Sequence, residues 1–324
     1  MHRRALLRGT AAAVAVATSG LAGCSESDPS ATATDTTTPT DTTTPTATAT
    51  PTPTPTPGDR SLQPYPSWLI APTEPTPHTY EFTHLSLAAV RADADPTFAE
   101  QLDTYWEQRA ESYFGVAVPV DDIDAVLTVN HSTVANESFR VLGGEFDPGA
   151  LRPALRDAGF EADGRVDDFQ RFVRTMEGRT RAFGLHPDVI VTIGASEGAT
   201  DPLASAVEQH AAGDHRTGTD EGLATLIDHF GDADYLTGRE LEADIDEDFP
   251  LNAAVATGRR LDVRGETTWS ERTYVFDPAA TVDREGIEEG IRRRHVGQPI
   301  EEYSRDGRIV TVAGEVENSL IRLL

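Results

Sequence analysis

The stretch between residues 25 and 57 limits most strongly what this chain can fold into, because it consists almost only of Thr, Pro, Ala, Ser and Asp. An Asp-Thr-Thr-Thr-Pro repeat begins at Asp35 and again at Asp41, and Thr-Pro alternation follows. Such a segment cannot bury enough apolar area to offset the entropy lost on ordering, and its prolines favour an extended chain. We therefore predict a disordered stalk over residues 24–66, either O-glycosylated or bare, and ordered sequence beyond it.

The first 24 residues resemble a known export and anchoring signal. Arg3 and Arg4 precede a mildly apolar run that ends at Gly23. This run is too short to span a bilayer, which takes about 20 apolar residues. The adjacent arginines resemble a twin-arginine export signal, and the Leu-Ala-Gly-Cys sequence ending at Cys24 resembles the lipobox of exported lipoproteins. The resemblance implies that residues 1–23 are removed and that the nucleophilic Cys24 sulfur receives a lipid.

Cys24 is the only cysteine of the 324-residue chain, so no intramolecular disulfide can form. The folded part must therefore be held together by its core. A two-chain lipid on Cys24 would give stable anchoring, so we predict a location on the extracellular face of the cell membrane. The alternative is a cleaved signal followed by an incidental cysteine.

The charge balance indicates a saline environment. The formal net charge is −27, and all 27 basic residues are arginine. This acidic, lysine-free composition resembles proteins of extreme halophiles, in which salt shortens the Debye length to about 3 Å and screens like-charge repulsion. Together with the N-terminal motifs, it resembles haloarchaeal lipoproteins exported by the twin-arginine route. The sequence has no basic patch, which argues against nucleic acid as a partner.

Helix and strand signals alternate along the remainder of the chain. Several amphipathic stretches start with a side chain that can cap a helix, and two of them end at a glycine, Gly115 and Gly231. The four expected N-caps are Asp95, Asp147, Thr219 and Asp277. Short β-branched or alternating segments lie between these helices. The expected strands include 80–87, 139–146, 190–194, 272–276 and 309–314.

We predict an α+β fold of two similar units, residues 67–215 and 216–324. Each unit follows the order helix, two strands, helix, two strands. Strand pairs interrupted by helices favour mostly antiparallel sheets with helices on one face, in a ferredoxin-like duplication. The outer domain resembles uncharacterised surface lipoproteins with paired α+β modules, a resemblance that implies no known activity.

Ser196 is a candidate nucleophile, because Gly194-Ala195-Ser196-Glu197-Gly198 matches the Gly-x-Ser-x-Gly elbow of hydrolases and follows a predicted strand. Asp262 and His295 come later in the chain, in the order that an acid and a base would take. The best helix start, Asp201, lies several residues after the serine, although an elbow needs a helix directly after it. We favour a glycine-rich turn.

Two groups of metal-ligand side chains match a metal site incompletely. The first group is His210, His215, Asp220 and His229. Its five-residue histidine spacing does not suit one helix face. The second group is Glu242, Asp244, Asp246, Glu247 and Asp248. It lacks the glycine and the glutamate that complete a calcium loop. We predict no metal and no other cofactor.

Asn130 and Asn136 each begin an N-glycosylation sequon, in a region expected to form a hairpin loop. The three tryptophans could mark a ligand platform, although Trp106 lies on the apolar stripe of its helix and is expected in the core. The other two are Trp68 and Trp269.

These observations favour a non-enzymatic surface lipoprotein that displays a binding or envelope-interaction module on a stalk. The expected partners are the membrane and either a small ligand or an envelope protein, and a cleft between the two units would be the ligand site. The alternative is a secreted serine hydrolase that uses Ser196. A transporter's solute-binding subunit would need two lobes of parallel sheet, which the pattern does not indicate. The oligomeric state is left open.

Overall fold

The computed structural model describes most of the chain beyond the predicted stalk. The described ranges are residues 65–70, 80–131, 138–196, 201–214, 216, 220–241, 250–281, 283–294 and 300–318. Arg3, Arg4, Cys24 and the Thr/Pro-rich segment lie outside them. The predictions of export, lipid attachment and a stalk therefore stay predictions.

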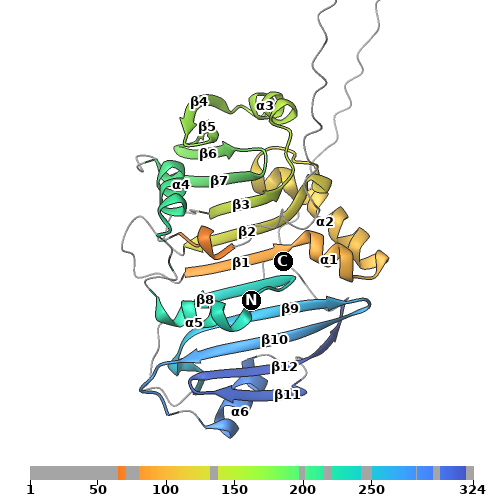
Figure 1. Cartoon of the computed structure of the whole chain (residues 1–324), viewed down its shortest axis with the longest axis vertical. Helices are drawn as coiled ribbons and strands as arrows, with labels where there is room; N and C mark the ends of the chain where they lie inside the picture. The colour runs from red at the N-terminus through yellow and green to blue at the C-terminus, as the bar shows by residue number, and fades with distance from the viewer. Residues whose placement is uncertain are drawn as a thin grey trace, which may run out of the picture. The chain divides into compact units, whose positions relative to one another are not determined.

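The described strands form one antiparallel sheet of 12 strands, in the order β11-β12-β10-β9-β8-β1-β2-β3-β7-β6-β5-β4 (Figure 1). Seven strands come from the first part of the chain: β1 Tyr80–Ser86, β2 Ile123–His131, β3 Ser138–Gly144, β4 Glu161–Val166, β5 Phe169–Met176, β6 Arg179–Leu185 and β7 Val189–Ser196. Five come from the second part: β8 Tyr235–Glu240, β9 Ala254–Arg264, β10 Thr267–Phe276, β11 Glu302–Asp306 and β12 Ile309–Glu317.

The predicted fold of two separate helix-and-strand units is wrong. β1 pairs with β2 on one edge and with β8 on the other, from Glu81 opposite Arg239 to Leu85 opposite Tyr235. This pairing joins the segments 67–215 and 216–324 into a single sheet. The physical reason is that an unpaired strand edge leaves backbone N–H and C=O groups unsatisfied, and β1 and β8 satisfy each other's edges.

The prediction of helices on one face of the sheet is also wrong, because helices cover both faces. Side chains of α4 and α5, such as Leu203 and Leu226, pack with Phe82 of β1 in one core cluster. Side chains of α1, α2 and α3 pack in a second cluster with Leu85, which points to the other face. The helices are α1 Leu87–Asp93, α2 Pro96–Phe114, α3 Pro148–Asp157, α4 Pro202–Ala212, α5 Glu221–Phe230 and α6 Arg284–Arg294.

A third core cluster lies at the β11 end of the sheet. There, Ile287 and Ile291 of α6 pack against Tyr274 and Phe276 of β10. Val275 between those two residues belongs to the α4–α5 cluster, so α6 covers the opposite face. The short 3-10 helix η1, Tyr65–Trp68, joins the α4–α5 face.

Most of the predicted helix ends are confirmed. Asp95 caps α2, and Gly115 ends it in the left-handed conformation, with φ 78°. Asp147 and Asp201 cap α3 and α4. Gly231 ends α5 as predicted, but Asp220 rather than Thr219 caps its start, through the Leu223 N–H at 2.6 Å.

The predicted helix start at Asp277 is wrong. The Asp277 side chain accepts a hydrogen bond from the Ala279 N–H at 2.7 Å and its carbonyl accepts one from the Ala280 N–H, which closes a turn. The helix begins later, where the Asp283 side chain accepts from the Gly286 N–H at 2.7 Å. An Asp-Pro pair favours a turn as readily as a helix start, so the sequence signal was ambiguous.

Candidate functional site

A cavity of about 670 Å³ opens beside the β1–β8 pairing, where the two segments of the chain meet. This volume lies in the range of small-molecule sites. The lining comes from β1, α1, the loop before β8, and β9. The residues are His84, Ser86, Ala89, Asp93, Asp232, Ala233, Asp234, Asp262, Val263 and Arg264. We refer to this cavity as the His84 pocket.

Local chain geometry brings these segments together. β1 ends at Ser86, whose side chain caps α1 by accepting from the Ala89 N–H at 3.3 Å. Before the neighbouring strand β8, Gly231 ends α5 at φ 58°, a value that favours glycine. The chain then passes through Asp232 and Ala233 into β8. The chain leaves the sheet after β1 and enters it at β8. The cavity lies beside these two points.

His84 is the most buried polar side chain that lines the pocket, with 1% of its surface exposed. Its ring stacks on Tyr65, with centroids 4.6 Å apart and an angle of 18° between the planes. Neither ring nitrogen has a hydrogen-bond partner among the described residues, and the same holds for the Tyr65 hydroxyl. Burial lowers the pKa of His84 to about 4, so the imidazole is neutral at pH 7.

Asp234 forms the buried part of the acidic wall, with 8% of its surface exposed. Its Oδ2 accepts a hydrogen bond from the Val263 N–H at 2.6 Å, and its carbonyl accepts one from the Ser86 N–H at 2.8 Å. Burial raises the pKa of Asp234, and the bond from Val263 opposes that rise. Asp234 therefore ties β9 and β1 to the loop before β8, whereas Asp93 and Asp232 are exposed.

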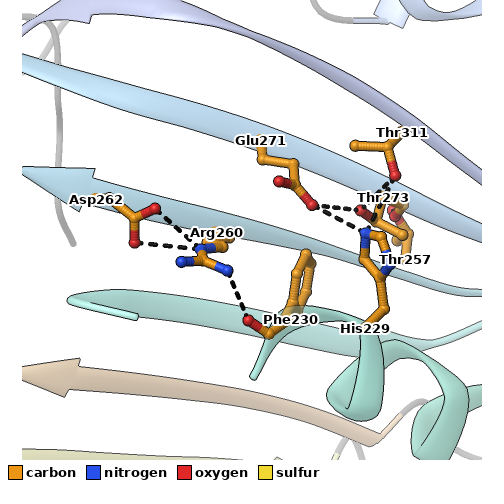
Figure 2. A network of polar contacts seen from close by, with 8 residues as sticks. All are labelled: His229, Phe230, Thr257, Arg260, Asp262, Glu271, Thr273 and Thr311. Carbon is orange, nitrogen blue, oxygen red and sulfur yellow. Dashed lines mark hydrogen bonds and ion pairs between the residues drawn. The ribbon is translucent and has the colours of Figure 1, made fainter. Parts of the chain in front are cut away.

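Asp262 connects the pocket to a polar network on the α5 side of the sheet (Figure 2). The Arg260 Nε lies 3.0 Å from Asp262 Oδ2, and the Arg260 Nη1 donates to the Phe230 carbonyl at 2.8 Å. The guanidinium therefore holds one pocket carboxylate and the end of α5 at the same time. Asp262 is partly neutralised by this pair, which leaves Asp93 and Asp232 as the more available charges.

His229, the residue before Phe230, has hydrogen-bond partners on two strands, unlike His84. Figure 2 shows its Nε2 between Glu271 of β10, at 3.0 Å, and Thr311 of β12, at 3.2 Å. Thr273 contacts the same Glu271 oxygen at 3.3 Å and the Thr311 hydroxyl at 3.2 Å. This His229 network fastens α5 to β10 and β12. The His229 Nε2, one Glu271 oxygen and the two threonine hydroxyls contact one another, so the geometry indicates a structural role.

The structure does not bring Asp262 to Ser196, as the alternative hydrolase reading would require. Ser196 is the last residue of β7 and pairs with Arg179 of β6, and α4 starts only at Pro202. Asp262 lies on β9, five strands away across the sheet, or about 24 Å at the usual strand spacing. Asp262 and Ser196 are therefore not brought together, and His295 lies outside the described residues.

The described members of the first candidate metal-ligand group have separate contacts. His210 stacks on Trp68 at 3.7 Å, Asp220 caps α5, and His229 bonds to Glu271, while His215 lies outside the described residues. Residues 242–249, which hold the alternating carboxylates, also lie outside them. Within the described ranges, no group of three or more His, Cys, Asp or Glu is arranged to hold a metal ion.

The remaining candidates have separate positions. Asn130 is exposed near the end of β2, and Asn136 lies outside the described ranges, so their glycosylation stays a prediction. Trp106 is 2% exposed within the α2 core, which confirms its expected packing. Trp68 is buried on the opposite face, and Trp269 lies under the Arg264 guanidinium, so the three do not share a platform.

Sequence reasoning missed most of the His84 pocket. His84 belongs to a predicted strand, and its alternation with Tyr80 and Phe82 places it on the buried side. A histidine at such a position was the available signal. Asp232 and Asp234 follow the glycine stop of a predicted helix, where acidic residues usually indicate only an exposed loop.

Among the described residues, no helix combines the length and the apolar character needed to cross a bilayer. No family model and no curated protein matches the chain. Three crystal structures of TP0453, in crystal forms I, III and IV, align with 78–80% of this chain and 92–98% of theirs. The identity is 10–11% and the TM-scores are 0.48–0.49. Likenesses of this size carry no argument about the function of this chain.

Proposed function

We propose that this protein is a non-enzymatic, lipid-anchored surface protein whose folded part binds a small molecule in the His84 pocket. The observation that supports binding is a buried imidazole at a cavity of about 670 Å³, whose two nitrogens have no partner among the residues that the structure describes. An orphaned buried polar group costs about 1–3 kcal/mol, and a bound molecule would remove that cost. A hydrolase has no comparable support, because the candidate acid lies far from Ser196.

The proposed location rests on the N-terminal sequence alone. Arg3 and Arg4 would direct export, and the lipid on Cys24 would hold the protein at the outer face of the cell membrane. A halophilic cell fits the acidic, lysine-free composition. The Thr/Pro-rich segment would carry the folded part away from the membrane.

The binding proposal is tested by filling the cavity. Ala89 lines the pocket on α1, whereas its neighbour Ala88 is exposed and does not line it. Thermal unfolding of the full chain carrying Cys24→Ser is measured with a panel of sugars, amino acids, amines and carboxylates. We expect at least one class of compound to raise the melting temperature. That shift should vanish in Ala89→Trp and persist in Ala88→Trp.

The result that contradicts binding is a panel without any shift that Ala89→Trp removes. The location is tested separately, by mass spectrometry of the mature N-terminus and detergent partitioning of wild type and Cys24→Ser. We expect a lipid-modified Cys24 as the first residue of the wild type. A wild-type chain that keeps residues 1–23 and partitions into water would refute the anchor.

A further inference from the structure

The His84 pocket has a polar gradient from its mouth to its floor. Asp93 and Asp232 are exposed, Asp262 is partly buried, and Asp234 and His84 are buried. The lining carries four carboxylates and one guanidinium, that of the exposed Arg264. Arg264 lies over the Trp269 ring, 5.4 Å from its centre. The mouth is therefore an acceptor-rich, negatively charged region.

The floor differs from the mouth. Burial is the cause that lowers the pKa of His84, and no carboxylate contributes to that shift. As a neutral ring the imidazole offers one N–H donor and one nitrogen acceptor, and neither has a partner in the described part of the chain. A group that satisfies the imidazole must be uncharged, because a charge would be desolvated there.

Apolar side chains and Ser86 supply the rest of the lining. Ala89 comes from α1, Ala233 from the loop before β8, and Val263 from β9. They leave room for a short hydrocarbon chain, and burying each methylene contributes about 0.8 kcal/mol. The pocket thus presents three surfaces in one cavity: acidic, apolar, and neutral but hydrogen-bonding.

We propose that the His84 pocket takes a small ammonium compound whose cationic end meets Asp232 and Asp93, whose stem is apolar, and whose uncharged polar end hydrogen-bonds to His84. This inference names the ligand class of the binding site proposed above and rests on that proposal. A metal ion fits less well, because the described residues hold no cluster of three ligands and Asp234 and Asp262 are already bonded to Val263 and Arg260.

The experiment uses four compounds of equal chain length: aminobutanol, butylamine, butanediol and hydroxybutyrate. Each is titrated calorimetrically into the full chain carrying Cys24→Ser. Aminobutanol carries both the ammonium and the hydroxyl group, butylamine lacks the hydroxyl, butanediol lacks the charge, and hydroxybutyrate is an anion. We expect aminobutanol to bind about tenfold more tightly than butanediol and a few-fold more tightly than butylamine, with no binding of hydroxybutyrate.

Two substitutions separate the ends of the pocket. Asp232→Asn should weaken both amines by about three- to tenfold, whereas Asp306→Asn, on the exposed strand β11 at the far end of the sheet, should leave both unchanged. His84→Phe keeps an aromatic ring for Tyr65 to stack on and removes both nitrogens. It should make aminobutanol and butylamine bind equally, while their advantage over butanediol remains.

Three results would overturn the inference. They are failure of both amines to bind, equal or tighter binding of butanediol or hydroxybutyrate, and an unchanged preference for aminobutanol in His84→Phe. The last result would mean that water or another group satisfies the imidazole. A neutral or anionic compound that binds and is blocked by Ala89→Trp would refute the ammonium ligand and still support the pocket as a binding site.

Discussion

Two histidines on the same face of the sheet have opposite environments. His84 is opposite Leu236 in the β1–β8 pairing and faces the α4–α5 core, with both nitrogens unpartnered among the described residues. His229 on α5 has its Nε2 between a carboxylate and a hydroxyl. The two differ both in burial, since His84 is buried and His229 is exposed, and in hydrogen-bond partners. A histidine with partners fastens elements together, and one without partners beside a cavity is available for a ligand.

Of the changes considered, acidification should have the largest effect on the free energy of unfolding, and it should act through His84. The pKa of His84 falls from 6.5 to about 4 on folding, so between these values the unfolded chain binds a proton that the folded protein does not. The contribution of neutral His84 to the free energy of unfolding is therefore complete above pH 6.5. It is lost as the pH falls toward 4, by about 3 kcal/mol in total. Urea unfolding of wild type and His84→Phe at constant salt measures the loss.

The carboxylates titrate in both proteins, so the difference between their pH profiles reports His84. We expect the His84→Phe profile to be flatter by about 3 kcal/mol. Identical profiles would mean that His84 is protonated in the folded protein as readily as in the unfolded chain.

Substitution of each histidine by phenylalanine should change the free energy of unfolding in opposite directions. His84→Phe removes two orphaned buried nitrogens and should raise the free energy of unfolding at pH 7 by about 1–2 kcal/mol. His229→Phe leaves the Glu271 carboxylate and the Thr311 hydroxyl without that partner and should lower it by about 0.5–1 kcal/mol, because His229 is exposed. Denaturant unfolding at neutral pH checks both, and a shared sign would contradict the comparison.

Arg260→Met tests the link between the two regions. The substitution removes the pair with Asp262 and the bond to the Phe230 carbonyl, so stability should fall by about 1 kcal/mol. It also frees the Asp262 charge, so aminobutanol should bind a few-fold more tightly in calorimetry. Arg305→Met, on an exposed part of β11, is the control. Weaker binding in Arg260→Met would show that Arg260 assists the ligand.

Thr311→Val should have the smallest effect. It removes hydroxyl contacts with Thr273 and His229 and should cost about 0.5–1 kcal/mol. Because the change lies away from the pocket lining, the affinity for aminobutanol should stay the same. A change in affinity larger than the calorimetric error would mean that the His229 network controls the pocket.

Local signals were readable from the sequence, and long-range pairing was not. The Asp95 cap and the Gly115 stop of α2 act within one helical turn, so a single chain segment reveals them. The pairing of Glu81 with Arg239 joins residues far apart in the chain, and no local pattern specifies it. That pairing is what merges the two expected units into one sheet.

For the candidate site too, the sequence indicated some residues, and the tertiary structure set their positions. Asp262 was identified from its place after a serine, but the strand order puts it next to Arg260 and the pocket rather than beside Ser196. His84 lay in a predicted strand without a predicted role. Its proposed role depends on the cavity that α1 and the loop before β8 line together with His84.

The sequence by itself determined the acidic, lysine-free composition, the single cysteine, the helix caps at Asp95 and Asp147 and the β-strand character of segments such as 80–87 and 190–194, because these are properties of single residues or short segments. Only the tertiary structure decided that β1 lies against β8, that helices cover both faces and that His84 borders a cavity with Asp232, Asp234 and Asp262. The reason is physical. Packing and strand pairing minimise free energy over the whole chain, and a cavity is what remains where those contacts end.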